Sequence, residues 1–151
     1  EGLLGAPEEI SAAGAGTGDW RDIARLALGA SAGPGALAAD EQPLDTLRFS
    51  RRWLRAQGLD PVRLSVISVT GDSMEPTLRD GDEILVERGA GPLRDGVHVV
   101  RLDDALLVKR LETARPGVLT LISDNPSYRP VERARDEVEV IGRVVWKGGR
   151  L

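Results

Sequence analysis

Two residues of this 151-residue chain have side chains that could act together in acyl-transfer chemistry. Ser73 lies between two Gly-Asp turns in the stretch VTGDSMEPTLRDGDEILV, and Lys109 lies 36 residues later in the apolar run LLVKRL. A serine hydroxyl becomes a useful nucleophile only when a base takes its proton, and a neutral lysine amine can be that base. Burial in an apolar strand favours the neutral amine because it lowers the lysine pKa. The pair therefore predicts a Ser-Lys dyad.

Each of these residues also has an ordinary structural interpretation. Gly-Asp-Ser is common turn chemistry, so Ser73 could be a turn residue. Lys109 could be an edge-strand lysine whose methylene stem packs on the sheet while its ammonium group stays in water. The single histidine, His98, is a competing base, but its strand VHVV offers no partner and we interpret it as structural. The chemistry becomes specific only if Ser73 and Lys109 meet.

The composition narrows the classes of protein. Apolar residues make up 41% of the chain, enough for a packed core, whereas a net charge of -4 argues against a nucleic-acid-binding face in this segment. There is no cysteine, no apolar run near the roughly 18 residues of a membrane span and no secretory signal, so we expect a cytoplasmic protein with no membrane contact. Neither metal-ligand spacing nor a phosphate-binding glycine loop occurs, and we expect no metal and no cofactor.

Short apolar runs separated by turns fill the chain from Leu64 onward. They are LSVISV, EILVE, GVHVVRL, ALLVKRL, VLTLIS and VEVIGRVVW. Asp103-Asp104 separates two of them and predicts a hairpin. The run WRDIARLAL, from Trp20 to Leu28, fits either a helix or a strand, and we favour a strand. Six or seven short strands predict a mostly β barrel or folded sheet.

One short helix completes the expected fold. Leu44, Leu47, Trp53 and Leu54 recur at helical spacing, and Gly58 is a stop signal, so we expect a helix from about Ser50 to Gln57. The Gly- and Ala-rich residues 1–18 are typical of a flexible linker.

Strict alternation in the closing run VEVIGRVVW would divide its apolar residues between two faces. Val138, Val140, Gly142, Val144 and Trp146 would share one face, with Ile141 and Val145 on the other. Such two-sided apolarity fits a buried strand or one shared at an interface. We leave both interpretations open.

Four stretches, GDSMEPTLRDGDEILV, LLVKRLE, ISDNPSY and VIGRVVW, together resemble the S24 peptidase family, the C-terminal domains of LexA-like and phage-type repressors. The resemblance runs from about Leu28 to Leu151. It implies a mostly β, LexA/signal-peptidase-like folded β-barrel, with Ser73 as nucleophile and Lys109 as general base. The backbone amides of Asp72 and Ser73 would form the oxyanion hole. Met74 would pack beside the nucleophile, and the loop at 123–126 would lie near the dimer and cleft region without a catalytic role.

Members of this family cut themselves at an Ala-Gly bond upstream of the serine. The matching bond here is Ala32-Gly33 in ASAGPG, which follows the apolar run IARLAL. Ala13-Gly14 and Ala15-Gly16 also occur, but no apolar run precedes them. Pro34 departs from an ideal cleavage strand because it removes a backbone donor and fixes φ just past the cut. The sequence thus divides into a linker at 1–18, a cleavage-site segment at 19–35 and a catalytic and dimerisation domain at 36–151.

The resemblance also implies partners. We expect a homodimer, a RecA–single-stranded-DNA filament that stimulates self-cleavage, and contact with operator DNA only through an N-terminal helix-turn-helix domain that this chain lacks. The chain does not begin with Met, and we expect it to be part of a longer protein. Two alternatives remain: a dimerisation and effector module with an idle dyad, and a processing peptidase acting on other proteins.

Overall fold

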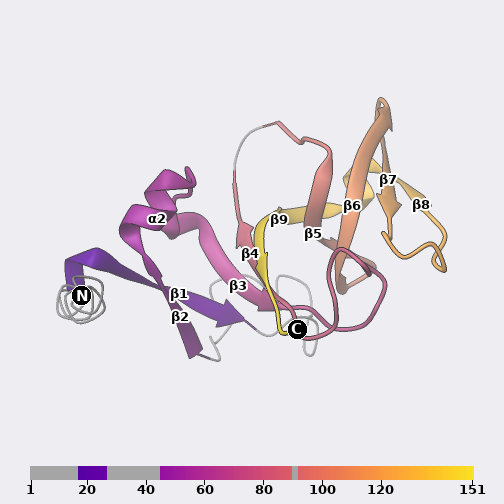
Figure 1. Ribbon diagram of the computed structural model, residues 1–151. Helices are drawn as coiled ribbons and strands as arrows, with labels where there is room; N and C mark the ends of the chain where they lie inside the picture. The colour runs from indigo at the N-terminus through magenta and orange to yellow at the C-terminus, as the bar shows by residue number, and fades with distance from the viewer. Residues whose placement is uncertain (1–16, 27–44, 90–91) are drawn as a thin grey trace.

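The computed structural model describes residues 17–26, 45–89 and 92–151, and these form a nine-stranded sheet with one α-helix (Figure 1). The strands are β1 (Trp20–Leu26), β2 (Asp45–Ser50), β3 (Leu64–Ser68), β4 (Glu83–Glu87), β5 (Gly96–Leu102), β6 (Ala105–Arg115), β7 (Val118–Ile122), β8 (Val131–Ala134) and β9 (Glu139–Gly148). The helix α2 spans Arg51–Ala56, and the 3-10 turns are η1 (Thr17–Asp19), η2 (Pro61–Arg63) and η3 (Arg135–Glu137). The predicted fold class, mostly β with one short helix, is confirmed.

The order of strands across the sheet is β2-β1-β3-β4-β9-β5-β6-β7-β8. Figure 1 shows the chain progressing from β1 and β2 at one end to β7 and β8 at the other, with β9 returning to the middle. All neighbouring strands are antiparallel except β1 and β3, which are parallel. Because β9 pairs with both β4 and β5, it joins the part that leads to Ser73 to the hairpin that contains Lys109.

The sequence prediction missed two strands, β2 and β8. We expected six or seven strands, and Leu47 was placed in a helical pattern although it lies in β2. Every residue of β2 pairs with β1 in antiparallel register. This long-range pairing outweighs the helical spacing of the apolar residues in the sequence. The predicted helix from about Ser50 to Gln57 is confirmed as α2. The Ser50 hydroxyl caps it by accepting a hydrogen bond of 3.1 Å from the Trp53 N–H.

Two tight turns set the register around Lys109. Asp103 and Asp104 both have positive φ, 51° and 64°, which two-residue hairpin turns require. Aspartate tolerates this left-handed conformation better than most residues. Gly117, with φ 77°, closes the next hairpin between β6 and β7. Both sides of β6 are therefore paired to antiparallel neighbours, and the hairpin predicted at Asp103-Asp104 is confirmed.

Three apolar clusters form the core. The first, beneath the connection that bears Ser73, has nine buried residues: Ile67, Val69, Met74, Leu78, Ile84, Val86, Val99, Leu106 and Val108. The second lies between the β5–β6 and β6–β7 hairpins and contains Val100, Leu102, Leu111, Leu119, Leu121 and Val138. The third packs α2 against β1, β3 and β4 through Ile23, Leu54, Leu64, Val66 and Leu85.

Strand β9 does not alternate as we expected. Its register shifts opposite Leu85/Val86 and again opposite Val99/Val100, so two bulges interrupt the two-residue period. As a result Ile141 and Val144, predicted on opposite faces, both pack against the first cluster. The bulges allow one strand to follow the bend of the sheet while its side chains serve different clusters.

Several predicted features lie outside the described residues. These are the Ala32-Gly33 bond and the linker at 1–18, of which only the last two residues are described, in η1. The strand predicted from Trp20 to Leu28 is confirmed as β1 to Leu26, and residues 27–28 are again outside the described part. Within the described ranges, no helix is long and apolar enough to cross a membrane.

We predict that Gly142→Ala destabilises the domain by about 1–3 kcal/mol, as overpacking of a filled site does. A Cβ at Gly142 would lie 2.7 Å from both the Glu87 carbonyl oxygen and Val86 Cγ1, so β4 and β9 would have to separate. Urea denaturation measures the change. Gly18→Ala is the matched control because a Cβ there has no neighbour within 4 Å. Equal free energies of unfolding for the parent and Gly142→Ala would contradict the close contact.

Candidate active site

Ser73 lies in the connection between β3 and β4, which is held at both ends. The Gly71 N–H donates a 2.7 Å hydrogen bond to Asp80 Oδ1, and the Gly81 N–H donates one of 2.8 Å to the Val69 carbonyl. Both glycines have positive φ, 84° and 91°, which favours glycine at these positions. The neighbouring Met74 is 2% exposed in the first cluster. Ser73 is thus a half-buried residue on a fixed turn, and Met74 packs in the core directly beside it, as expected.

Lys109 in β6 reaches this turn. Its Nζ donates hydrogen bonds to Ser73 Oγ at 3.2 Å and to Ser123 Oγ at 2.8 Å. None of the carboxylates in the described ranges forms an ion pair with it. Burial lowers the pKa of the Lys109 amine, because leaving water penalises the charged form. The structure therefore brings together the two residues that the sequence singled out, with the amine in a setting that favours its neutral form.

Ser123 is a member of this group that the sequence analysis did not select. In the β6–β7 hairpin Arg110 pairs with Ile122 and Leu111 with Leu121, so the next position along the same register sets Ser123 opposite Lys109. Its side chain is buried with only 8% of the residue exposed. The turn at Gly117 does not identify this partner by itself, because the register of β6 against β7 shifts between Glu112 and Arg115 before the strands reach Lys109.

The loop that follows Ser123 contacts the turn that contains Ser73. The Asn125 backbone N–H donates to the Ser73 carbonyl at 3.0 Å, and its side-chain Nδ2 donates to the Asp72 carbonyl at 3.0 Å. The Tyr128 hydroxyl donates to Asp72 Oδ1, and its ring centroid lies 5.9 Å from Lys109 Nζ. The hydrogen bond to Asp72 raises the pKa of the Tyr128 hydroxyl. The sequence predicted only that this loop lies near the cleft. In the structure it forms hydrogen bonds with Asp72 and Ser73 themselves.

The backbone amides predicted to form an oxyanion hole are unengaged within the described part of the chain. No hydrogen bond among those residues uses the N–H of Asp72 or of Ser73 as donor. The carbonyls of both residues, by contrast, accept hydrogen bonds from Asn125, and the Asp72 carbonyl also accepts one from the Glu75 N–H. The two amides are therefore available to donate to an incoming oxyanion.

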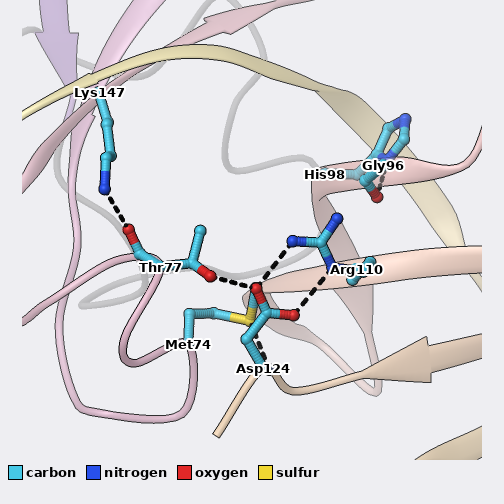
Figure 2. A network of polar contacts seen from close by, with 7 residues as sticks. All are labelled: Met74, Thr77, Gly96, His98, Arg110, Asp124 and Lys147. Carbon is cyan, nitrogen blue, oxygen red and sulfur yellow. Dashed lines mark hydrogen bonds and ion pairs between the residues drawn. The ribbon is translucent and has the colours of Figure 1, made fainter.

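His98 has a different environment from the dyad, although it pairs with Lys109 across β5 and β6. It is 3% exposed, and burial lowers its pKa. Its Nδ1 lies 2.8 Å from the Gly96 carbonyl (Figure 2), and since a carbonyl only accepts, this nitrogen has the proton. A cavity of about 390 Å³ is lined by His98 together with Arg94, Arg135 and Arg143, and Ser73 does not line it. These contacts agree with a structural interpretation of His98.

No group of three or more His, Cys, Asp or Glu side chains within the described ranges could hold a metal ion. The polar groups that do converge are two hydroxyls, one amine and the amides of a turn. Such a set is suited to proton transfer between Ser73 and Lys109 and to attack on a carbonyl carbon.

Comparison with known proteins identifies the family of this chain. The Peptidase S24-like family matches residues 26–145. The chain belongs to this family. The HTH-type transcriptional regulator PrtR of Pseudomonas aeruginosa is 34% identical over 123 residues, covering 77% of this chain and 48% of PrtR.

Two phage repressors are similar to this chain at comparable identity. The repressor protein CI of Enterobacteria phage phi80 is 33% identical over 103 residues, which is 66% of this chain and 44% of that protein. The 26 kDa repressor protein of Escherichia phage HK022 is 33% identical over 115 residues, or 73% and 48%. The chain spans about half the length of these relatives. The family resemblance drawn from the four sequence stretches is therefore confirmed.

We predict that the Lys109 amine titrates below its ordinary pKa of 10.5. The folded state then binds fewer protons than the unfolded state between the two pKa values, so the free energy of unfolding rises as pH increases through that window. NMR of the lysine side chains measures the midpoint, and Lys147→Gln assigns the signals because the chain has only two lysines. Lys109→Met should abolish the extra pH-dependent rise in urea denaturation. A Lys109 midpoint at or above 10.5 would contradict the effect of burial.

Proposed function

We propose that this chain is the C-terminal self-cleaving and dimerisation domain of a transcriptional repressor of the SOS or prophage type. The observation that supports this most directly is the 3.2 Å approach of Lys109 Nζ to Ser73 Oγ. This distance is short enough for direct proton transfer once the amine is neutral. Membership of the S24 family and the similarity to repressors support the wider biological role.

In the proposed reaction, neutral Lys109 takes the proton of the Ser73 hydroxyl as Oγ attacks the carbonyl carbon of Ala32. The N–H groups of Asp72 and Ser73 stabilise the oxyanion. Lys109 then gives its proton to the nitrogen of Gly33, the Ala32–Gly33 bond breaks, and an ester joins Ala32 to Ser73. Water, deprotonated by Lys109, hydrolyses this ester and restores the hydroxyl. The hydrogen bond to Ser123 Oγ keeps the amine directed toward the nucleophile turn.

The choice of Ala32-Gly33 rests on the strand pairing upstream of it. β1 and β3 are parallel, with Leu26 beside Ile67. Ala32 follows Leu26 by six residues and Ser73 follows Ile67 by six residues. Six residues can span at most about 20 Å, so Ala32 and Ser73 can lie at similar distances from the paired residues Leu26 and Ile67. The pairs at 13–14 and 15–16 precede β1 and do not share this starting point.

An ion-pair network joins the strands that flank residues 27–44. Near the end of β1, Arg25 Nε lies 2.8 Å from Oδ1 of Asp45 at the start of β2. Its Nη1 lies 2.8 Å from Oε2 of Glu83 in β4. Ser68 at the end of β3 donates to the same Glu83 carboxylate. The described residues on either side of 27–44 are therefore held together in β1 and β2, and β1 pairs with β3, which favours cutting within the same molecule.

In the whole protein, we propose, two copies of this domain pair so that two DNA-reading domains bind one operator. Joining two binding modules raises their effective concentration, and cutting the chain between DNA-reading and dimerisation parts removes that gain. We propose a RecA–single-stranded-DNA filament as the stimulus and the cytoplasm as the location. Both proposals rest on the family.

A second candidate function is a dimerisation and effector module in which the dyad is idle. The observation in its favour is that Lys109 Nζ lies nearer to Ser123 Oγ, at 2.8 Å, than to Ser73 Oγ, at 3.2 Å. An amine held by Ser123 in this way would leave the Ser73 hydroxyl unactivated.

We predict that alkaline pH accelerates a single cut after Ala32, because deprotonation of Lys109 supplies the base. Intact mass under denaturing conditions, after incubation near pH 7 and near pH 10, should show fragments 1–32 and 33–151. The rate should rise with pH up to the Lys109 midpoint and then level off. Ser73→Ala and Lys109→Met should remain whole at both pH values, which would assign the cut to the dyad rather than to a contaminating protease.

A chain that stays whole at both pH values, alone and with a RecA filament, would favour the idle-dyad candidate. Gly33→Val offers a separate control for the bond, because a β-branched side chain hinders a sharp backbone bend at the cut. If the parent yields fragments of other masses and Gly33→Val is cut at the parent's rate, Ala32-Gly33 is the wrong bond.

A further inference from the structure

A network of polar contacts lies on the opposite side of β6 from the dyad. Figure 2 shows a chain of contacts from Lys147 through Thr77 to Asp124 and Arg110. Arg110 directly follows Lys109, and consecutive side chains of a strand point to opposite faces. Asp124 directly follows Ser123. The network is thus built from the immediate neighbours of the groups that meet at the dyad, without touching the reacting atoms.

Asp124 is the centre of this network. Arg110 donates to both of its carboxylate oxygens, at 2.9 Å and 2.8 Å, and the Thr77 hydroxyl donates to Oδ2 at 2.5 Å. The Asp124 backbone N–H also approaches Met74 Sδ at 3.5 Å. Only 12% of the Asp124 side chain is exposed, and the hydrogen bonds from Arg110 hold its pKa below the usual range. One carboxylate therefore ties β6, the loop after β7 and the Ser73 turn to each other.

Thr77 is fixed from a second direction. Its carbonyl accepts a 2.7 Å hydrogen bond from Lys147 Nζ of β9, while its hydroxyl binds Asp124. Thr77 lies four residues after Ser73 on the same connection, and the Leu78 N–H that follows it donates to the Met74 carbonyl at 2.9 Å. Movement at Thr77 would therefore be transmitted along one short turn to Ser73.

We propose that Asp124 is a positioning residue, whose bidentate pair with Arg110 and bond to Thr77 set the approach of Ser73 Oγ to Lys109 Nζ. This inference rests on the proposed function of the dyad. A bidentate arginine–carboxylate pair fixes orientation as well as distance, which apolar packing alone does less well. Asn125 and Tyr128, which also bond to the Ser73 turn, follow Asp124 in the same loop.

The first test compares self-cleavage rates across pH for the parent and Asp124→Asn. Asparagine is similar in size and can still accept from Thr77, but it cannot bind the arginine through two oxygens. We expect the plateau rate at alkaline pH to fall about tenfold or more, since small displacements of reacting groups cost this much. The midpoint of the profile should stay in place, because burial rather than Asp124 lowers the Lys109 pKa.

Two further variants keep the test decisive. Thr77→Val removes one hydroxyl at nearly constant volume and should lower the plateau by a smaller factor. Glu132→Gln is the matched control, because it breaks the exposed pair of Glu132 with Arg115, a residue of the same strand β6, and should leave the plateau unchanged. All rates are measured where urea denaturation shows each variant to be folded. An unchanged plateau in folded Asp124→Asn overturns the proposal.

A second arm does not depend on cleavage. In the parent, Ser73→Ala removes a hydrogen bond to Lys109 Nζ and should shift the NMR signal of that amine. In the Asp124→Asn background the same substitution should shift it less, because the hydroxyl is no longer held in place. Equal shifts in both backgrounds overturn the positioning role, whether or not the chain cuts itself. A chain that never cuts but shows unequal shifts refutes the proposed function and retains the positioning role.

Discussion

The arrangement of this domain depends on an amine in an apolar sheet, with which no carboxylate of the described ranges forms an ion pair. Lys109 has two hydroxyl oxygens as its polar partners and an aromatic ring 5.9 Å away. A carboxylate at hydrogen-bond distance would favour the charged form of the amine, whereas neutral hydroxyls do not add a negative charge beside it. The carboxylate of Asp124, which directly follows Ser123, is instead paired with Arg110 on the other face of β6. Two opposite electrostatic environments thus lie one residue apart on the same strand.

Strand β9, in the middle of the sheet, connects the two groups of strands that contribute these residues. The Ser73 turn belongs to β3 and β4, whereas Lys109, Ser123 and Asp124 belong to the β5–β6–β7 hairpins, and β9 pairs with both sides. Its bulges let apolar residues reach the cluster beneath Ser73, and Lys147 near its end binds the carbonyl of Thr77. The geometry between Ser73 and Lys109 is therefore a tertiary property that depends on segments far apart in the chain.

What could be predicted from the sequence followed local signals. Ser73 and Lys109 were marked by a turn and by a cation in an apolar run, and Ser50 and Gly58 bounded the helix correctly. Strand β2 was missed because its pairing with β1 crosses a long segment and leaves little periodicity in six residues. The alternation of β9 was wrong because bulges respond to the bend of the whole sheet. Ser123 and Asp124 could not be selected from the sequence. The position of Ser123 opposite Lys109 depends on the register of β6 against β7, and the contact of Asp124 depends on the distant Thr77.

The pairing of β1 with its neighbours affects what a cut between residues 27 and 44 would achieve. Six residue pairs join β1 to β2 and two join it to β3, and Arg25 adds ion pairs to Asp45 and Glu83. None of these contacts requires the backbone to be continuous through the segment from 27 to 44. A nicked chain would stay assembled until β1 peels away from the sheet by local opening. Hydrolysis and physical release are then separate events, and the lifetime of the nicked assembly sets the delay between them.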